Sequence, residues 1–240
     1  MTSLEPYYAD DWVTLYNADC RDVLAGLDDE SVDAVITDPP YTDRVHANSR
    51  VSGMKHRTVG MQFGAITDDD LDALMAECGR VSRGWVVANM DYHHAAKFDD
   101  TPPAGLAMKR IGVWMKKTPM PQLTGDRPAQ GWEAIAYMHR DDRKSVWNGG
   151  GQHGNFYMAA ATGHGHPTSK PIGMVETFIE RFTGMGEPAT APPLVLDPFA
   201  GSGTTLRAAK NLRRHAIGVE VDERYCELIA RRMAQEVLFP

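Results

Sequence analysis

The chain has 240 residues, of which 42% are hydrophobic and 24% are charged, and its formal net charge is −7. This length can bury the core of one globular domain, and no apolar run reaches the roughly 18 to 20 residues of a membrane-spanning helix. The three cysteines lie far apart and the first residues, MTSLEPYYADDW, are acidic. We therefore expect a soluble, cytoplasmic protein without a disulfide framework, a metal site, a membrane anchor or a secretion signal.

Strands and helices alternate along the chain, which is typical of a mostly parallel sheet covered by helices on both faces. The apolar patterns predict strands at 12–17, 32–37, 85–90, 106–117, 133–140, 193–199 and 215–221. Helical spacing and capping residues predict helices at 20–27, 67–81, 170–182, 204–214 and 222–236. The strands at 106–117 and 133–140 form an expected antiparallel pair, and the glycine-rich stretch 148–166 is expected to be irregular.

A glycine turn, DPFAGSGTT (197–205), follows one predicted strand and opens the next helix. Gly201 and Gly203 permit a tight turn and close approach of the backbone to a ligand, and Glu220 ends the following strand, where nucleotide sites place a carboxylate for ribose hydroxyls. The turn lacks a P-loop lysine and a third glycine, and Asp197 would repel a pyrophosphate. A ligand with an ammonium group, such as S-adenosylmethionine, suits the turn better, and a turn without any ligand is the alternative.

The stretch TDPPY (37–41) follows another predicted buried strand. The Asp38 carboxylate and the Pro39 carbonyl can together accept both hydrogens of an exocyclic amino group, while Tyr41 stacks on its base and Pro40 stiffens the corner. Such acceptors would localise the lone pair of the nitrogen for in-line attack on a sulfonium methyl group. Taken alone, the stretch is equally compatible with a plain turn after a strand.

In this order, TDPPY, HPTSKP (166–171) and LDPFAGSGTT resemble the motifs of the beta-class amino-group DNA methyltransferases, which methylate adenine or cytosine amino groups. The resemblance covers essentially the whole chain, with Ser169 where the family usually has glutamine. It implies one α/β domain over 1–240 with a permuted Rossmann-like methyltransferase fold. It also implies S-adenosyl-L-methionine as cofactor and double-stranded DNA as partner, with flipping of the target base.

The resemblance also implies roles for individual residues. The catalytic positions are Asp38, Pro39, Pro40 and Tyr41, and the cofactor positions are Asp19, Asp38, Thr168, Lys170, Asp197, Phe199, Gly201, Gly203 and Glu220. Thr168 and Lys170 are expected beside the methionine carboxylate, and Asp19 beside the adenine of the cofactor. For Asp19, capping of the following helix is the alternative role.

Basic side chains supply candidates for DNA binding despite the negative net charge. These residues are Arg44, Arg50, Lys55, Arg57, Lys116, Lys117 and Arg127. The segment 118–165 is the expected small target-recognition insertion. Because it is short, either the recognised DNA sequence is short or a second subunit contributes surface, which is compatible with a homodimer.

Three functions stay open at this point. A site-specific adenine methyltransferase, as found in restriction-modification systems, is favoured because aspartate at the first motif position is commonest among adenine enzymes. The same chemistry on cytosine amino groups, RNA or a protein glutamine is the second, and a catalytically silent binding partner is the third. A ring-carbon cytosine enzyme is disfavoured because it needs a nucleophilic cysteine after a proline, and no cysteine here has that neighbour.

Overall fold

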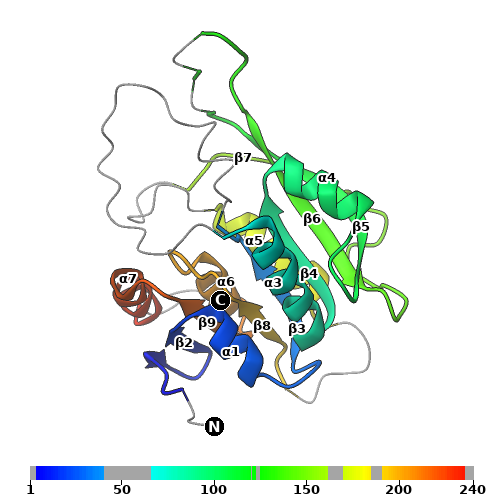
Figure 1. Cartoon of the computed structure of the whole chain (residues 1–240). Helices are drawn as coiled ribbons and strands as arrows, with labels where there is room; N and C mark the ends of the chain where they lie inside the picture. Colours follow the sequence, from blue (N-terminus) through cyan, green and yellow to red (C-terminus); the bar gives the residue numbers. More distant parts are fainter. Residues whose placement is uncertain are drawn as a thin grey trace.

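A computed structural model of the chain describes residues 4–40, 66–119, 121–122, 125–161, 170–184 and 191–235. Nine strands in these ranges form one sheet in the order β1-β2-β9-β8-β3-β4-β6-β5-β7. The strands are β1 (Tyr8–Ala9), β2 (Val13–Asn17), β3 (Val32–Thr37), β4 (Ser82–Met90), β5 (Leu106–Lys116), β6 (Trp132–Arg140), β7 (Phe156–Met158), β8 (Leu194–Asp197) and β9 (His215–Glu220). Figure 1 shows the long β5–β6 pair at one side of the molecule and β2 at the other.

The centre of the sheet is parallel, and β6 introduces antiparallel pairing beyond β4. Strands β2, β9, β8, β3 and β4 all run in the same direction, whereas β6 is antiparallel to both of its neighbours, β4 and β5. The expected antiparallel pairing of β5 with β6 is thereby confirmed. The parallel strands β3 and β4 are almost entirely buried, as expected of strands with helices on both faces.

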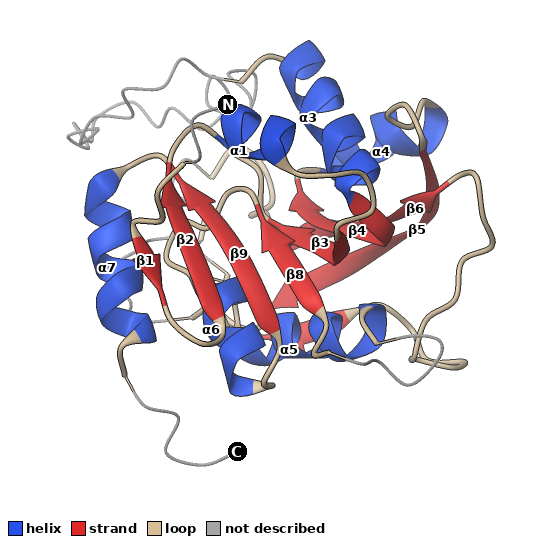
Figure 2. Ribbon diagram, turned by 90° about the horizontal axis from the view of Figure 1, so that it is seen from below, coloured by secondary structure: helices blue, strands red, loops and turns tan. Residues whose placement is uncertain are grey.

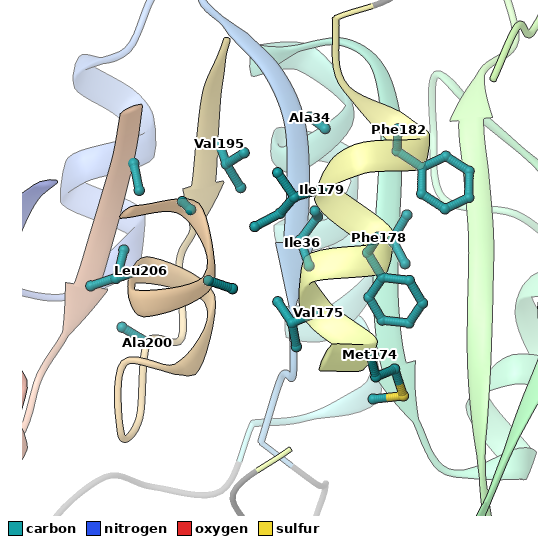
Figure 3. Close-up of a cluster of buried hydrophobic side chains, with 14 of the residues drawn as sticks. Ala34, Ile36, Met174, Val175, Phe178, Ile179, Phe182, Val195, Ala200 and Leu206 are labelled. Carbon is teal, nitrogen blue, oxygen red and sulfur yellow. The ribbon is translucent and has the colours of Figure 1, made fainter. Parts of the chain in front are cut away.

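Helices cover both faces of the sheet (Figure 2). On one face lie α1 (Cys20–Gly26), α3 (Asp68–Val81) and α4 (Tyr92–Asp100), and on the other lie α5 (Ile172–Phe182), α6 (Thr204–Asn211) and α7 (Glu223–Met233). Each set of helices closes its own hydrophobic cluster against the strands. Figure 3 shows Val175, Phe178 and Ile179 of α5 beside Ile36 of β3, which fixes the position of the chain just before α5.

The strand order is permuted relative to the sequence. Strands β8 and β9, which come last along the chain, lie between β2 and β3, which come first. All five parallel strands therefore end at one edge of the sheet, where ligands collect in open α/β sheets. This arrangement brings together residues from the two ends of the sequence.

Three short elements were not expected from the sequence: β1, β7 and α4. Helix α4 contains only a few apolar residues, and its start is fixed by Asp91, whose carboxylate accepts hydrogen bonds from the backbone of His93 and His94. Strand β7 lies in the stretch predicted to be irregular and exists because it pairs with the end of β5. Within the described ranges, no helix combines the length and the apolar character needed to cross a bilayer.

Candidate active site

The acidic corner after β3 and the glycine corner after β8 lie next to each other. Strands β3 and β8 are paired in parallel, so their last residues, Thr37 and Asp197, reach the same edge of the sheet. The Thr37 hydroxyl donates a hydrogen bond of 2.8 Å to Oδ1 of Asp197, across 160 positions of sequence. The two corners therefore share one edge of the sheet, and Asp38 is the residue that directly follows Thr37 in the chain.

The two glycines of the turn have different surroundings. Both have left-handed backbone conformations, with φ of 53° at Gly201 and 74° at Gly203. A Cβ atom at Gly203 would lie 3.0 Å from Ile229 of α7, whereas the nearest atom to a Cβ at Gly201 is the Phe199 carbonyl oxygen at 3.9 Å. Gly203 thus serves close packing at the start of α6, whereas no described residue beyond the chain neighbours of Gly201 crowds that position.

Glu220 at the end of β9 supports the glycine turn from the next strand. Its Oε2 accepts a hydrogen bond of 2.9 Å from the Gly201 backbone, and its Oε1 accepts one of 2.9 Å from the Asp222 backbone. Burial raises the pKa of this carboxyl, and the backbone donors oppose that effect. Because a carboxylate has about four lone-pair positions, these two bonds leave capacity for hydroxyl donors.

Asp197 lies beneath the turn and is buried, with 4% of its surface exposed. Besides the Thr37 hydroxyl, the Phe199 backbone donates a hydrogen bond to its Oδ1, at 3.2 Å. Burial raises the pKa of Asp197 to about 6, against the opposing hydrogen bonds from Thr205 and Thr37. The carboxylate therefore ties β8 to β3 and to the turn.

The raised pKa of Asp197 predicts a pH dependence of stability. A carboxyl with a pKa of about 6 in the folded chain and 3.8 ordinarily binds more protons when folded, so stability falls as the pH rises between these values. In Asp197→Asn this titration is absent. The free energy of unfolding of the variant minus that of the parent should therefore be about 2 kcal/mol higher at pH 7.5 than at about pH 4.5. Urea denaturation at both pH values measures this difference, and a constant difference would contradict the assignment.

Asp38 belongs to a line of alternating charges at the same edge. The Lys170 ammonium, which lies just before α5 and is only 6% exposed, contacts Oδ2 of Asp38 and lies 3.4 Å from Oε2 of Glu133. The other oxygen of Glu133, Oε1, pairs with the Lys116 ammonium at 2.6 Å. Burial disfavours the charged form of Lys170, but the carboxylates of Asp38 and Glu133 outweigh it and raise the lysine pKa.

Comparison with known proteins shows the family of the chain. The model of the N6/N4 family, described as DNA methylase, matches residues 32–231. The chain belongs to this family of amino-group DNA methyltransferases. Two curated relatives are type II methyltransferases: M2.DpnII of Streptococcus pneumoniae is 25% identical over 97% of this chain and 93% of its own length, and M2.LlaDCHI of Lactococcus lactis subsp. cremoris is 26% identical over 95% and 92%.

Solved structures agree with the observed fold of the methyltransferase. The cytosine-N4-specific PvuII DNA methyltransferase superposes with a TM-score of 0.74 over 99% of this chain and 92% of its own, at 16% identity. TTHA0409 of Thermus thermophilus, solved as a complex with S-adenosyl-L-methionine, is 26% identical, with a TM-score of 0.63 over 93% and 95% of the two chains. The expected permuted methyltransferase fold is confirmed.

Glu133 is the site residue of the methyltransferase that sequence reasoning missed. It lies near the start of β6, in the sequence WEAIAYMHR, and its side chain is 14% exposed. The attraction of Lys170 and Lys116 outweighs the effect of burial and lowers its pKa. The available signal was a single acid among the mostly apolar residues of a predicted strand.

Asp19 and Lys170 of the methyltransferase both have partners within the protein. Asp19 is the N-cap of α1, where its Oδ1 accepts hydrogen bonds from the backbone and guanidinium of Arg21, at 2.9 and 3.0 Å. The Arg21 guanidinium lowers the pKa of Asp19. This geometry is the capping alternative considered for Asp19. Lys170, expected beside a methionine carboxylate, is paired inside the protein with Asp38 and Glu133.

The remaining predicted residues of the methyltransferase are distributed as follows. Pro39 is buried, Pro40 is exposed and Phe199 is half-buried. Among the DNA-binding candidates, Lys116 is engaged by Glu133, the exposed Lys117 lies over the Tyr157 ring at 5.5 Å, and Arg127 pairs with Asp126 at 2.8 Å. The candidates Tyr41, Arg44, Arg50, Lys55, Arg57 and Thr168 lie outside the described residues. Within the described ranges, His, Cys, Asp and Glu side chains form no group of three suited to a metal ion.

Proposed function

We propose that this methyltransferase transfers a methyl group from S-adenosylmethionine to the exocyclic amino group of adenine in DNA, after the base has been flipped out of the duplex. The observation that carries the proposal is the position of Asp38. It follows β3 at the edge where the glycine turn follows the adjacent strand β8, and the Thr37 to Asp197 hydrogen bond joins the two corners. An amine acceptor and a nucleotide-type turn thus lie side by side.

The proposed roles follow from the chemistry of the reaction. Asp38 and the Pro39 carbonyl accept the two hydrogens of the amino group, and Tyr41 stacks on the base, which offsets part of the few kcal/mol that flipping costs. The nitrogen lone pair forms the bond to the methyl carbon while the electrons of the carbon–sulfur bond return to sulfur. The nitrogen becomes cationic and releases its proton to water. No covalent intermediate with the enzyme is needed.

The glycine turn and Glu220 are the proposed holders of the methyl donor. S-adenosylmethionine, when bound, supplies an electrophilic methyl group on a positively charged sulfur. The backbone at Gly201 leaves room for such a ligand, because among the described residues beyond its chain neighbours the nearest atom to a Cβ position there is the Phe199 carbonyl oxygen, at 3.9 Å. Glu220 retains lone pairs for ribose hydroxyls beside its two backbone bonds. The buried Asp197 then acts by fixing the turn.

Adenine is the proposed target base because Asp38 occupies the first motif position, where adenine enzymes most often have aspartate. Cytosine is the second candidate. The observation in its favour is the fold similarity to the cytosine-N4-specific PvuII enzyme, with a TM-score of 0.74. Both bases carry an exocyclic amino group, so the acceptors Asp38 and Pro39 serve either one.

We assign target recognition to the segment 118–165, except for the residues of β6 in its middle. Residues Trp132–Arg140 form β6, which pairs with β4 and β5 inside the sheet. Base contacts are therefore assigned to the two parts of the segment that flank β6. Because these parts are short, a homodimer that doubles the recognition surface is compatible with the arrangement.

The test is to identify the methylated nucleoside. We expect that incubation with S-adenosylmethionine labelled in the methyl group, unmodified double-stranded DNA and the purified full-length chain yields N6-methyladenine after digestion to nucleosides. Label in N4-methylcytosine would show that the target base is cytosine and not adenine, and it would leave the rest of the proposal intact. The absence of label from every nucleoside, with intact donor binding, would instead favour a silent binding partner.

A further inference from the structure

The buried charge line at the active edge extends beyond the residues that the proposed reaction uses. Lys170 stands between two carboxylates, Asp38 and Glu133, and Glu133 stands between two ammonium groups, Lys170 and Lys116. The four charges come from different places in the chain: directly after β3, the end of β5, the start of β6 and two residues before α5. These segments are separated in sequence, and the fold brings their charged side chains together.

The burial of the line makes its charge balance important. Lys170 and Glu133 have side chains that are only 6% and 14% exposed. A buried ammonium is costly unless it is paired, and removal of one partner leaves an uncompensated charge. In the intact line two ammonium groups face two carboxylates. The other two members are more accessible, since Lys116 is 26% exposed and Asp38 is 31% exposed.

We infer that Glu133 is a positioning residue for methyl transfer, which acts on Asp38 by sharing the Lys170 ammonium with it. This inference rests on the proposed function, because it assumes that Asp38 orients the target amine. With Glu133 present, the ammonium is held between two carboxylates. Without it, Asp38 is the remaining carboxylate partner of the ammonium, which then competes more strongly with the substrate amine for the same carboxylate.

The net charge of the line affects the barrier in the same direction. Positive charge develops on the attacking nitrogen as the sulfonium is neutralised. If Glu133 loses its charge, the line carries one excess positive charge close to this nitrogen, in an environment that screens poorly. The barrier to transfer should therefore rise, whereas the glycine turn and Glu220, which lie on β8 and β9, should still bind the methyl donor.

The experiment compares Glu133→Gln and Glu133→Asp in the full-length protein. Glu30→Gln is the matched control, because Glu30 forms an ion pair with Arg143 at 2.7 Å before the opposite end of β3. We expect Glu133→Gln to lower kcat at least about tenfold, with the KM for S-adenosylmethionine within about threefold of the parent value. Glu133→Asp, which keeps the charge, should recover part of this loss, and Glu30→Gln should match the parent.

The outcomes separate this inference from the proposed function. An unchanged kcat in Glu133→Gln would overturn the inference. A loss of donor binding, measured by calorimetry, that accounts for the whole loss of activity would also overturn it. Equal losses of kcat in Glu133→Gln and Glu133→Asp would overturn it as well. Either result indicates that Glu133 has a structural role. A parent protein that methylates cytosine would overturn the choice of adenine only, and the kcat comparison would apply unchanged. A parent protein that transfers no methyl group to DNA would overturn both.

Discussion

Asp38→Ala should reduce methyl transfer to background, a loss of at least about 10³-fold, because the variant lacks the carboxylate that orients the amine. Binding of S-adenosylmethionine should change by no more than about threefold, since the glycine turn and Glu220 belong to other strands. The rate of label transfer to DNA and the calorimetric dissociation constant of the donor measure the two effects. Equal rates for variant and parent would remove the role assigned to Asp38.

Two companion variants make the Asp38 result specific. Asp38→Asn keeps a carbonyl acceptor and the size of the side chain but loses the charge, so its rate should lie between those of the parent and of Asp38→Ala. Asp29→Ala is the surface control, because the Asp29 side chain is 74% exposed and pairs with Arg80 before β3 begins. It should leave both the rate and donor binding unchanged.

Lys170→Met should be the most destabilising single change at the site. The variant leaves Asp38 and Glu133 as two half-buried or buried carboxylates without the ammonium between them. Breaking a buried pair in this way typically costs about 3 to 5 kcal/mol, so we expect the free energy of unfolding at neutral pH to fall by about 3 kcal/mol. Methyl transfer should fall with it, because Asp38 loses the partner that holds its Oδ2.

The control for Lys170→Met is Lys97→Met. Lys97 pairs with Asp72 at 2.7 Å, but both side chains are more than a third exposed, so this change should cost at most about 1 kcal/mol. Replacing Lys170 and Glu133 together by methionine and leucine should recover part of the stability without recovering activity. Two apolar side chains can fill the most buried part of the line, while Asp38 and Lys116, which lose their partners, are 31% and 26% exposed. Urea denaturation of all three variants decides the matter, and a Lys170→Met protein as stable as the parent would contradict the buried pairing.

The central strands and most helices were predictable because their signals are local. One such signal is the mostly apolar run Val32–Thr37. Another is the capping box of α3, in which Thr67 and Asp70 exchange hydrogen bonds. Each signal is contained within a few consecutive residues. Helix α4 and strand β7 were missed for the opposite reason. Helix α4 depends on its cap and on packing against the sheet, and β7 depends on pairing with β5.

At the site, the corners were predictable and the contacts between side chains were not. The TDPPY stretch and the glycine turn each carry a sequence pattern, and the parallel sheet places them at a common edge. The partners of Lys170 depend on how α5 packs on the sheet and on the position of β6, which no local pattern specifies. For the same reason the sequence allowed two roles for Asp19 without choosing between them.

The insertion of β8 and β9 between β2 and β3 also has a consequence during translation. A nascent chain that stops before Leu194 contains both β2 and β3 but lacks the strands that separate them in the finished sheet. The edges of two largely apolar strands then stay open, and such edges promote aggregation. The central sheet can close only after β9, which ends at Glu220, has left the ribosome, so products terminated before that point should depend on chaperones and be degraded.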